Sequence, residues 1–297
     1  MRNLRTARGS SIRSLREPGM RSHYIWIWIA LAGAAACVHG QWLNHATPGT
    51  PRTRDGKADL SARAPRVSNG KPDLSGIWVA ESATREELLR LFPGGENNLG
   101  EISPSRYFMN IFSDFKAEDV PIRPAAAAIA QEHRAGLAKD IPLTRCLPAG
   151  VPLVNALPAP YKLIQTPTVI AMLYEQDTSF RQIFIDGRKP LDDPQPSWLG
   201  YSVGKWDGDS LVVGTAGFND RSWLDAFGHP HSEAMRVTER FHRRDFGHME
   251  VQITVDDATM YTKPFTITIN QRLLPDTDLI ESFCLENEKD RVHLVGK

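Results

Sequence analysis

Short runs of apolar, β-branched and aromatic residues recur through the second half of the chain. Nine such runs lie at residues 161–165, 169–174, 180–186, 201–206, 211–215, 234–242, 248–255, 265–273 and 279–285. Turn signals such as Asp186-Gly187 and Pro275-Asp276 separate them, and no helical pattern intervenes. This pattern predicts a mainly antiparallel all-β domain. Because large sheets usually close to remove their edges, we expect a lipocalin-like barrel, closed or partly closed.

One hairpin stands out within this pattern. The sequence Asp207-Gly208-Asp209 separates the runs at residues 201–206 and 211–215. An Asp-Gly pair supplies the positive φ angles that a tight hairpin turn requires. We therefore expect two antiparallel strands with Asp207 and Gly208 as the central turn residues.

Residues before the strand-rich region have a different organisation. Residues 83–91 carry a helical pattern that Thr84 can cap, and residues 124–137 predict a second helix with Pro124 in its first turn. We predict four parts: a signal peptide (1–40), an extended tether (41–76), an arm with short helices (77–145) and the antiparallel barrel (146–297). The tether contains a repeat, because residues 55–62 (DGKADLSA) resemble residues 69–76 (NGKPDLSG).

The first forty residues have the pattern of a secretory signal. An apolar run at residues 24–38 follows several arginines, and a cleavage site before Gln41 is expected. Cys37 raises the alternative of a lipoprotein, which Ala34 disfavours because a lipobox usually has a large aliphatic residue there. We therefore predict a periplasmic or secreted protein without a transmembrane segment in its mature chain.

Charge and cysteine content limit the partners and the cell compartment that we expect for the protein. The leader contains six of the 35 basic residues and one of the 35 acidic residues, so the mature protein is mildly acidic. This balance argues against a nucleic-acid partner. Two cysteines remain, Cys146 and Cys284, and a pair in an oxidising compartment predicts a disulfide, with two buried thiols as the alternative.

Candidate functional residues gather after the hairpin. Between residues 218 and 232, aromatic, acidic and imidazole side chains are too frequent for a loop that only connects two strands. We expect this loop to form a ligand site at the barrel mouth for a small, partly apolar molecule. The predicted ligand-binding residues are Trp198, Trp206, Phe218, Asp220, Trp223 and His229.

The same loop allows two kinds of chemistry. His231 with Asp225 or Glu239 would form a pair for general acid/base catalysis. The alternative for Glu239 is a structural ion pair with an arginine such as Arg181 or Arg188. His229 and His231, two residues apart on an extended segment, could share a metal ion, although no third ligand has the right spacing. Nucleotide-binding and haem motifs are absent from the sequence, so no cofactor is expected.

Three motifs together resemble a known group of proteins: residues 70–78 (GKPDLSGIW), 204–213 (GKWDGDSLVV) and 228–232 (GHPHS). They are similar to a large family of exported acidobacterial and proteobacterial proteins that carry no assigned activity. The resemblance implies export and a single β-rich domain, and it implies no catalytic residues.

Three functions remain open from the sequence. The first is an exported small-molecule-binding barrel with its site at the mouth. The second is a cofactor-free isomerase, lyase or hydrolase that uses the histidine and carboxylate pair. The third is an envelope interaction protein in which the loop forms a protein interface and the barrel has no cavity.

Overall fold

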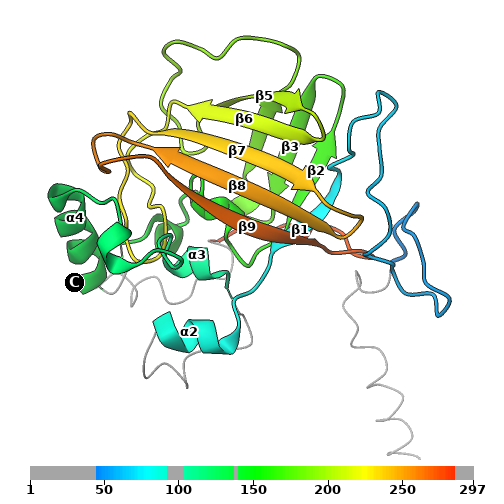
Figure 1. The fold of residues 1–297 in the computed structure, drawn as a ribbon, viewed down its shortest axis with the longest axis horizontal. Helices are drawn as coiled ribbons and strands as arrows, with labels where there is room; N and C mark the ends of the chain where they lie inside the picture. Colours follow the sequence, from blue (N-terminus) through cyan, green and yellow to red (C-terminus); the bar gives the residue numbers. More distant parts are fainter. Residues whose placement is uncertain (1–44, 92–103, 137–139, 285–297) are drawn as a thin grey trace, which may run out of the picture. The chain divides into compact units, whose positions relative to one another are not determined.

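Nine strands form one closed barrel, with neighbours in the order β1 to β9 (Figure 1). The structure, a computed structural model, describes residues 45–91, 104–136 and 140–284. The predicted signal peptide lies outside the described residues. The prediction of an all-β barrel is confirmed. The strands are β1 (Gly76–Ala80), β2 (Tyr161–Gln165), β3 (Val169–Tyr174), β4 (Phe180–Phe184), β5 (Tyr201–Asp207), β6 (Ser210–Ala216), β7 (Arg236–Arg243), β8 (His248–Asp256) and β9 (Phe265–Leu273).

The barrel departs from consecutive hairpins at one place. Strands β4 and β5 pair in parallel, whereas all other neighbours, including β1 and β9, are antiparallel. An odd number of strands cannot alternate in direction all the way around a closed barrel, so at least one parallel pair is unavoidable. Residues 185–200 make this crossover and return the chain to the end where β4 began.

The prediction of a strand at residues 279–285 is wrong. Residues 279–284 form no strand, and the barrel is closed instead by β1, which pairs with β2 and β9. The C-terminal segment runs outside the barrel, where Ile280 and Phe283 are about half exposed. In β1, by contrast, Trp78 is fully buried and its indole N–H donates to the carbonyl of Leu74 at 3.0 Å. Burial of that indole explains why β1 completes the core.

The predicted hairpin is present with its turn shifted by one residue. Asp207 pairs with Ser210, so Gly208 and Asp209 are the central turn residues. Gly208 has a φ of +57°, which suits the first central position of a type II′ turn. The shift keeps Trp206 opposite Leu211, whose side chain is buried in the core.

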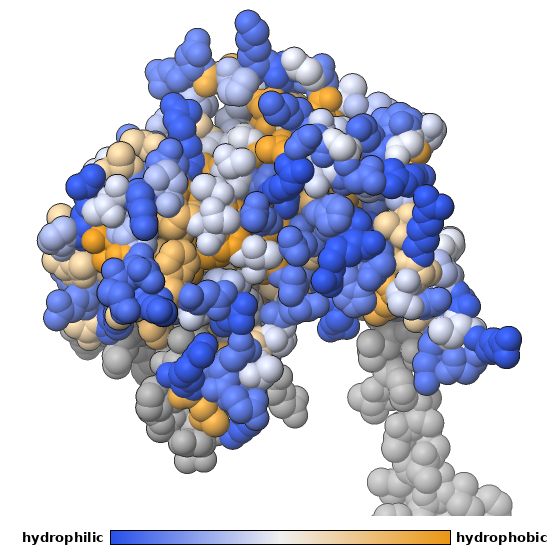
Figure 2. Space-filling model, in the orientation of Figure 1, coloured by the Kyte–Doolittle hydropathy of each residue, from blue (hydrophilic) through white to orange (hydrophobic). Residues whose placement is uncertain are grey.

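Alternation of side chains separates the core from the surface. Inward-facing residues such as Met172, Val213 and Ile253 are fully buried. The outward residues of β7, β8 and β9 are mostly threonine, arginine, glutamine and asparagine, and the face that these strands present is mainly hydrophilic (Figure 2). The sheet therefore encloses a mainly apolar core.

The two ends of the barrel differ, and we name them by what they carry. The loop end carries the β6–β7 loop, residues 217–235. The repeat end carries the β5–β6 and β7–β8 turns together with the two sequence repeats, drawn in blue in Figure 1. Residues 149–157, here called the plug, are all buried and close the loop end.

The segment predicted as an extended tether is folded where it is described. In the first repeat, the backbone N–H of Thr53 donates to Lys57 O and that of Asp59 donates to Pro51 O. The second repeat makes the same two backbone bonds fourteen residues later, from Val67 N–H to Lys71 O and from Asp73 N–H to Pro65 O. The two repeats are therefore two copies of one folded turn.

Both repeats dock on the barrel. The backbone N–H of Gly247 in the β7–β8 turn donates to Leu60 O at 2.8 Å. Leu74 of the second repeat is buried, and its N–H donates to the side chain of Gln165 at 2.9 Å. The leucine of each copy thus anchors its turn at the repeat end.

The predicted helices are confirmed. In α2 (Arg85–Leu91), Thr84 and Glu87 form a capping box, because each backbone N–H donates to the other side chain. Helix α4 (Pro124–Ala135) begins with its proline and buries Ala126 and Ala130. A further short helix, α3 (Arg106–Met109), was not predicted. Among the residues that the structure describes, no helix has the length and apolar character needed to span a bilayer.

Candidate functional site

The side chains of the β6–β7 loop pack against other parts of the protein, including α4. The Trp223 ring stacks on His133 of α4 with 4.1 Å between ring centroids, and the His133 imidazole contacts Gly228 O at 2.8 Å. Trp223 retains 6% of its surface exposed, and Phe218 has none. These aromatic side chains therefore form part of the core at the loop end.

Asp225 and His229 form a buried pair inside this loop. The two are joined by Oδ2 and Nδ1 at 2.5 Å, and the same Oδ2 accepts the backbone N–H of Ile111 at 2.7 Å. Asp225 is fully buried, and His229 is 6% exposed. The Phe112 ring packs nearly perpendicular to the imidazole, with 4.9 Å between the ring centroids. A carboxylate that holds Nδ1 in this way orients the ring and leaves Nε2 for other chemistry.

His231 has different partners from those predicted. Its Nε2 lies 2.7 Å from Ser222 Oγ and its Nδ1 lies 3.2 Å from the carbonyl of Ser232. A carbonyl only accepts, so Nδ1 carries the proton and Ser222 donates to Nε2. Burial lowers the pKa of His231, and the hydrogen bond to the Ser232 carbonyl and the charge of nearby Asp257 oppose that effect in part. The predicted pairing of His231 with Asp225 or Glu239 is wrong, because these carboxylates bind other groups.

Glu239 forms the structural ion pair that was the alternative. It lies inside the barrel on β7 and pairs with Arg181 of β4, both almost completely inaccessible. Arg181 also donates to Ser202 Oγ at 2.9 Å and to Thr215 Oγ1 at 2.8 Å. The Glu239 carboxylate is therefore neutralised and held within a polar network in the core.

The remaining predicted ligand residues do not form one site. Trp206 is near the repeat end, where it lines a different hollow with residues of the second repeat. Asp220 is exposed and Trp198 is half-buried. Phe218 lines a cavity of about 320 Å³ at the loop end with Pro194. The predicted hairpin already implied this separation, because Trp206 precedes its turn and Phe218 follows its second strand, at the opposite end.

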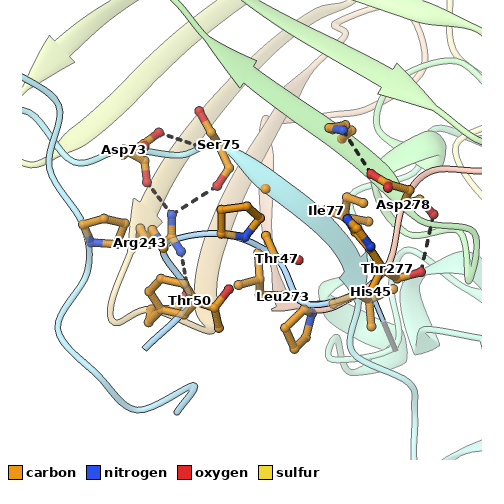
Figure 3. A pocket seen from close by; sticks show the side chains of 18 residues that line it. His45, Thr47, Thr50, Asp73, Ser75, Ile77, Arg243, Leu273, Thr277 and Asp278 are labelled. Atoms are coloured by element: carbon orange, nitrogen blue, oxygen red, sulfur yellow. Dashed lines mark hydrogen bonds and ion pairs between the residues drawn. The ribbon is translucent and has the colours of Figure 1, made fainter. Parts of the chain in front are cut away.

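A larger hollow at the repeat end was missed by the sequence analysis. This terminal cleft has a volume of about 510 Å³ and lies between chain segments from both ends of the described chain (Figure 3). Its walls come from residues 45–50 and 274–278 together with the start of β1 and the β7–β8 turn. Its lining includes Ile77, Phe246, Leu273, Leu274, Lys162 and Arg243.

Arg243 is the buried charge of the terminal cleft. Its guanidinium donates to the backbone carbonyls of Asp73 at 2.6 Å and Ser75 at 3.3 Å and also to that of Phe246. It lies over the Trp78 ring at 4.9 Å. Burial lowers the pKa of Arg243 to about 10, so the group stays charged at neutral pH. Figure 3 shows it toward one end of the cleft, with His45 and Asp278 toward the other.

The strap formed by residues 274–284 is held at both ends. Arg52 forms a bidentate ion pair with Asp276 near its start. At its end the predicted disulfide is confirmed, because Cys284 is bonded to Cys146. The strap therefore gives the terminal cleft a wall that is fastened to the rest of the protein.

Metal binding by the two loop histidines has no support in this geometry, since each imidazole has its own partner. Within the described ranges, no three His, Cys, Asp or Glu side chains gather in a way that could bind a metal ion.

Comparison of the chain with models of known protein families and with curated proteins found no match. No activity is therefore carried over from a relative.

Proposed function

We propose that this is an exported barrel protein that binds a small, partly apolar molecule in the terminal cleft. The observation that carries the proposal is the hollow of about 510 Å³, lined by apolar and polar side chains in similar measure, whose size is that of a small-molecule site. Export is supported by the leader pattern and by the Cys146–Cys284 disulfide, which is typical of an oxidising compartment.

The lining indicates what such a molecule would contact. Ile77, Leu273 and Phe246 offer apolar surface for its body. Lys162 and Arg243 offer positive charge for a polar end, although Lys162 also faces Asp278 at 3.5 Å. We place the ligand here rather than at the barrel mouth, because the aromatic residues of the β6–β7 loop are occupied by packing.

Filling the cleft tests this proposal. Isothermal titration calorimetry with 1-anilinonaphthalene-8-sulfonate, an apolar dye with an anionic group, measures binding to the mature protein. Thr277→Trp introduces a large ring into the cleft lining and should weaken dye binding at least about tenfold, which corresponds to about 1.4 kcal/mol. Thr259→Trp is the control, because Thr259 is exposed in the β8–β9 loop at the other end.

Equal dye affinity in wild type and Thr277→Trp would overturn the cleft site. Native mass spectrometry of protein from its exporting host measures any retained ligand, and loss of that ligand in Thr277→Trp but not in Thr259→Trp would support the site. If wild type retains no ligand and binds no dye, the interaction-protein alternative replaces the proposal.

A second candidate function is favoured by the Asp225–His229 pair. A buried carboxylate on Nδ1 prepares an imidazole to accept or donate a proton at Nε2, the arrangement used in general acid/base catalysis. In this candidate the enzyme is a cofactor-free isomerase, lyase or hydrolase in which His229 replaces the predicted His231. His229→Gln should abolish any turnover found in a substrate screen, while dye binding at the terminal cleft persists. Turnover that survives in folded His229→Gln would exclude this candidate.

A further inference from the structure

The barrel interior beneath the plug contains polar atoms that have no partner. Among the described residues, the side chains of Asn155, Tyr161 and Gln271 each bury an oxygen without a hydrogen bond. Asn155 and Tyr161 are 1% exposed and Gln271 is fully buried. Natural proteins rarely leave such atoms unpaired in an apolar core, because each has lost its hydrogen bonds to water.

These three side chains are linked through the buried polar network of Glu239. Asn155 extends from the plug into the barrel, where its Nδ2 donates to Glu239 at 2.6 Å and its backbone carbonyl accepts Nε2 of Gln271 at 2.8 Å. Tyr161 lies close enough to Glu239 and Arg181 for both charges to act on its pKa, which burial raises. Glu239 is therefore the common neighbour of Asn155 and Tyr161, and Gln271 adjoins Asn155.

The chemistry of the missing partner follows from the orientation of the two amides. The Asn155 side chain contacts a carboxylate, and the Gln271 side chain contacts a backbone carbonyl. Both of these groups only accept hydrogen bonds, so the amide nitrogens must point to them. The unpaired atoms of Asn155 and Gln271 are consequently carbonyl oxygens. A partner for either one must be a hydrogen-bond donor.

Charge in the region is already balanced. Arg181 neutralises Glu239 through two hydrogen bonds, so a molecule bound near this pair does not need to supply a counterion. The Tyr161 hydroxyl can donate or accept a hydrogen bond. These properties suit an O–H or N–H group.

We propose that the barrel interior is a second binding site, independent of the terminal cleft, for a guest that presents a hydroxyl or amine to Asn155 Oδ1, Gln271 Oε1 and the Tyr161 hydroxyl. Ordered water and the polar end of a small organic molecule share this chemistry. The plug covers the site, so a guest enters during folding or when residues 149–157 move aside.

A crystal structure of the wild-type protein tests the proposal directly. Ordered density within hydrogen-bond distance of Asn155 Oδ1 and Gln271 Oε1 is expected. A single isolated peak identifies water, and continuous density with a matching mass in denatured extracts identifies an organic guest, so both outcomes support the site. An empty, dry interior with the same side-chain positions would overturn it.

The sign of a stability change gives an independent test. If the Tyr161 hydroxyl binds a guest, Tyr161→Phe should raise the equilibrium constant of unfolding about fivefold, the usual effect of losing one hydrogen bond. If no guest is present, the same substitution removes an unpaired polar group and leaves stability unchanged or increased, which contradicts a role for Tyr161. Tyr261→Phe calibrates the measurement, because the Tyr261 hydroxyl donates to Pro230 O at 2.7 Å.

Discussion

His229 Nδ1 lies 2.5 Å from Asp225 Oδ2, and the same carboxylate oxygen accepts the backbone N–H of Ile111, 114 residues away in sequence. One buried carboxylate thus joins the β6–β7 loop to the segment that follows α3. Its position explains why a loop so rich in polar residues packs closely.

Asp225→Asn should lower the free energy of unfolding by about 1.5 to 3 kcal/mol, as expected for hydrogen bonds to a charged group. The amide keeps one acceptor but loses the charge shared by His229 and Ile111. Urea denaturation measures the change. Asp220→Asn in the same loop is the control, and because Asp220 is exposed it should have almost no effect. Equal effects of the two variants would contradict the structural role of Asp225.

Glu239→Gln should destabilise the protein by about 3 to 5 kcal/mol, because it leaves the Arg181 guanidinium buried without its counter-charge. Replacing both partners, as in Arg181→Met with Glu239→Leu, should cost less than Glu239→Gln alone, since no buried charge remains. Thermal and urea unfolding of the two variants provide the comparison. A larger loss in the double variant would show that the pair stabilises the core.

The lowered pKa of His231 predicts loss of stability in acid. The folded state holds this imidazole neutral below its usual pKa of 6.5, so the unfolded state binds more protons in that range. Its contribution to stability is complete above pH 6.5 and is lost as the pH falls toward the folded pKa. Wild type should therefore lose stability more steeply between about pH 7 and 5 than His231→Gln. His242→Gln, at an exposed position, is the control for removing one imidazole from the protein.

The disulfide should contribute to stability without being required for folding. It links residues 138 positions apart, and the chain-entropy model assigns about 4 to 5 kcal/mol to such a loop as an upper figure. Cys146→Ser with Cys284→Ser should lower the urea midpoint while far-ultraviolet circular dichroism stays that of a β protein. Peptide mapping of exported protein under non-reducing conditions should recover the bridge, and free thiols there would refute it.

Gly208→Val should cost about 1 to 2 kcal/mol, because a β-branched residue disfavours the φ of +57° at this turn. An added Cβ at Gly208 meets no atom within 4 Å, and the same is true at Gly214, whose φ is not positive. Gly214→Val is thus a control with equal space and a different backbone conformation. Matching melting temperatures for the two variants would show that the turn is not the cause.

The sequence by itself determined the elements whose signals are local. Short runs of apolar, β-branched and aromatic residues located eight of the nine barrel strands, Gly208 marked the hairpin, and Thr84 marked the start of α2. The cysteine count identified the disulfide. These signals depend on composition or on residues within one turn or one strand of each other. They can therefore be recognised without knowledge of the fold.

Only the tertiary structure decided which polar groups meet. Asp225 pairs with His229 and not with His231, because the loop backbone and the N–H of Ile111 fix the position of the carboxylate. Glu239 pairs with Arg181 because both side chains point into the same barrel. The terminal cleft arises where residues 45–50 and 274–278 converge, and the unpaired oxygens of Asn155, Tyr161 and Gln271 arise from three separate segments. Contacts between distant segments depend on the closure of the barrel, and no local pattern along the chain encodes them.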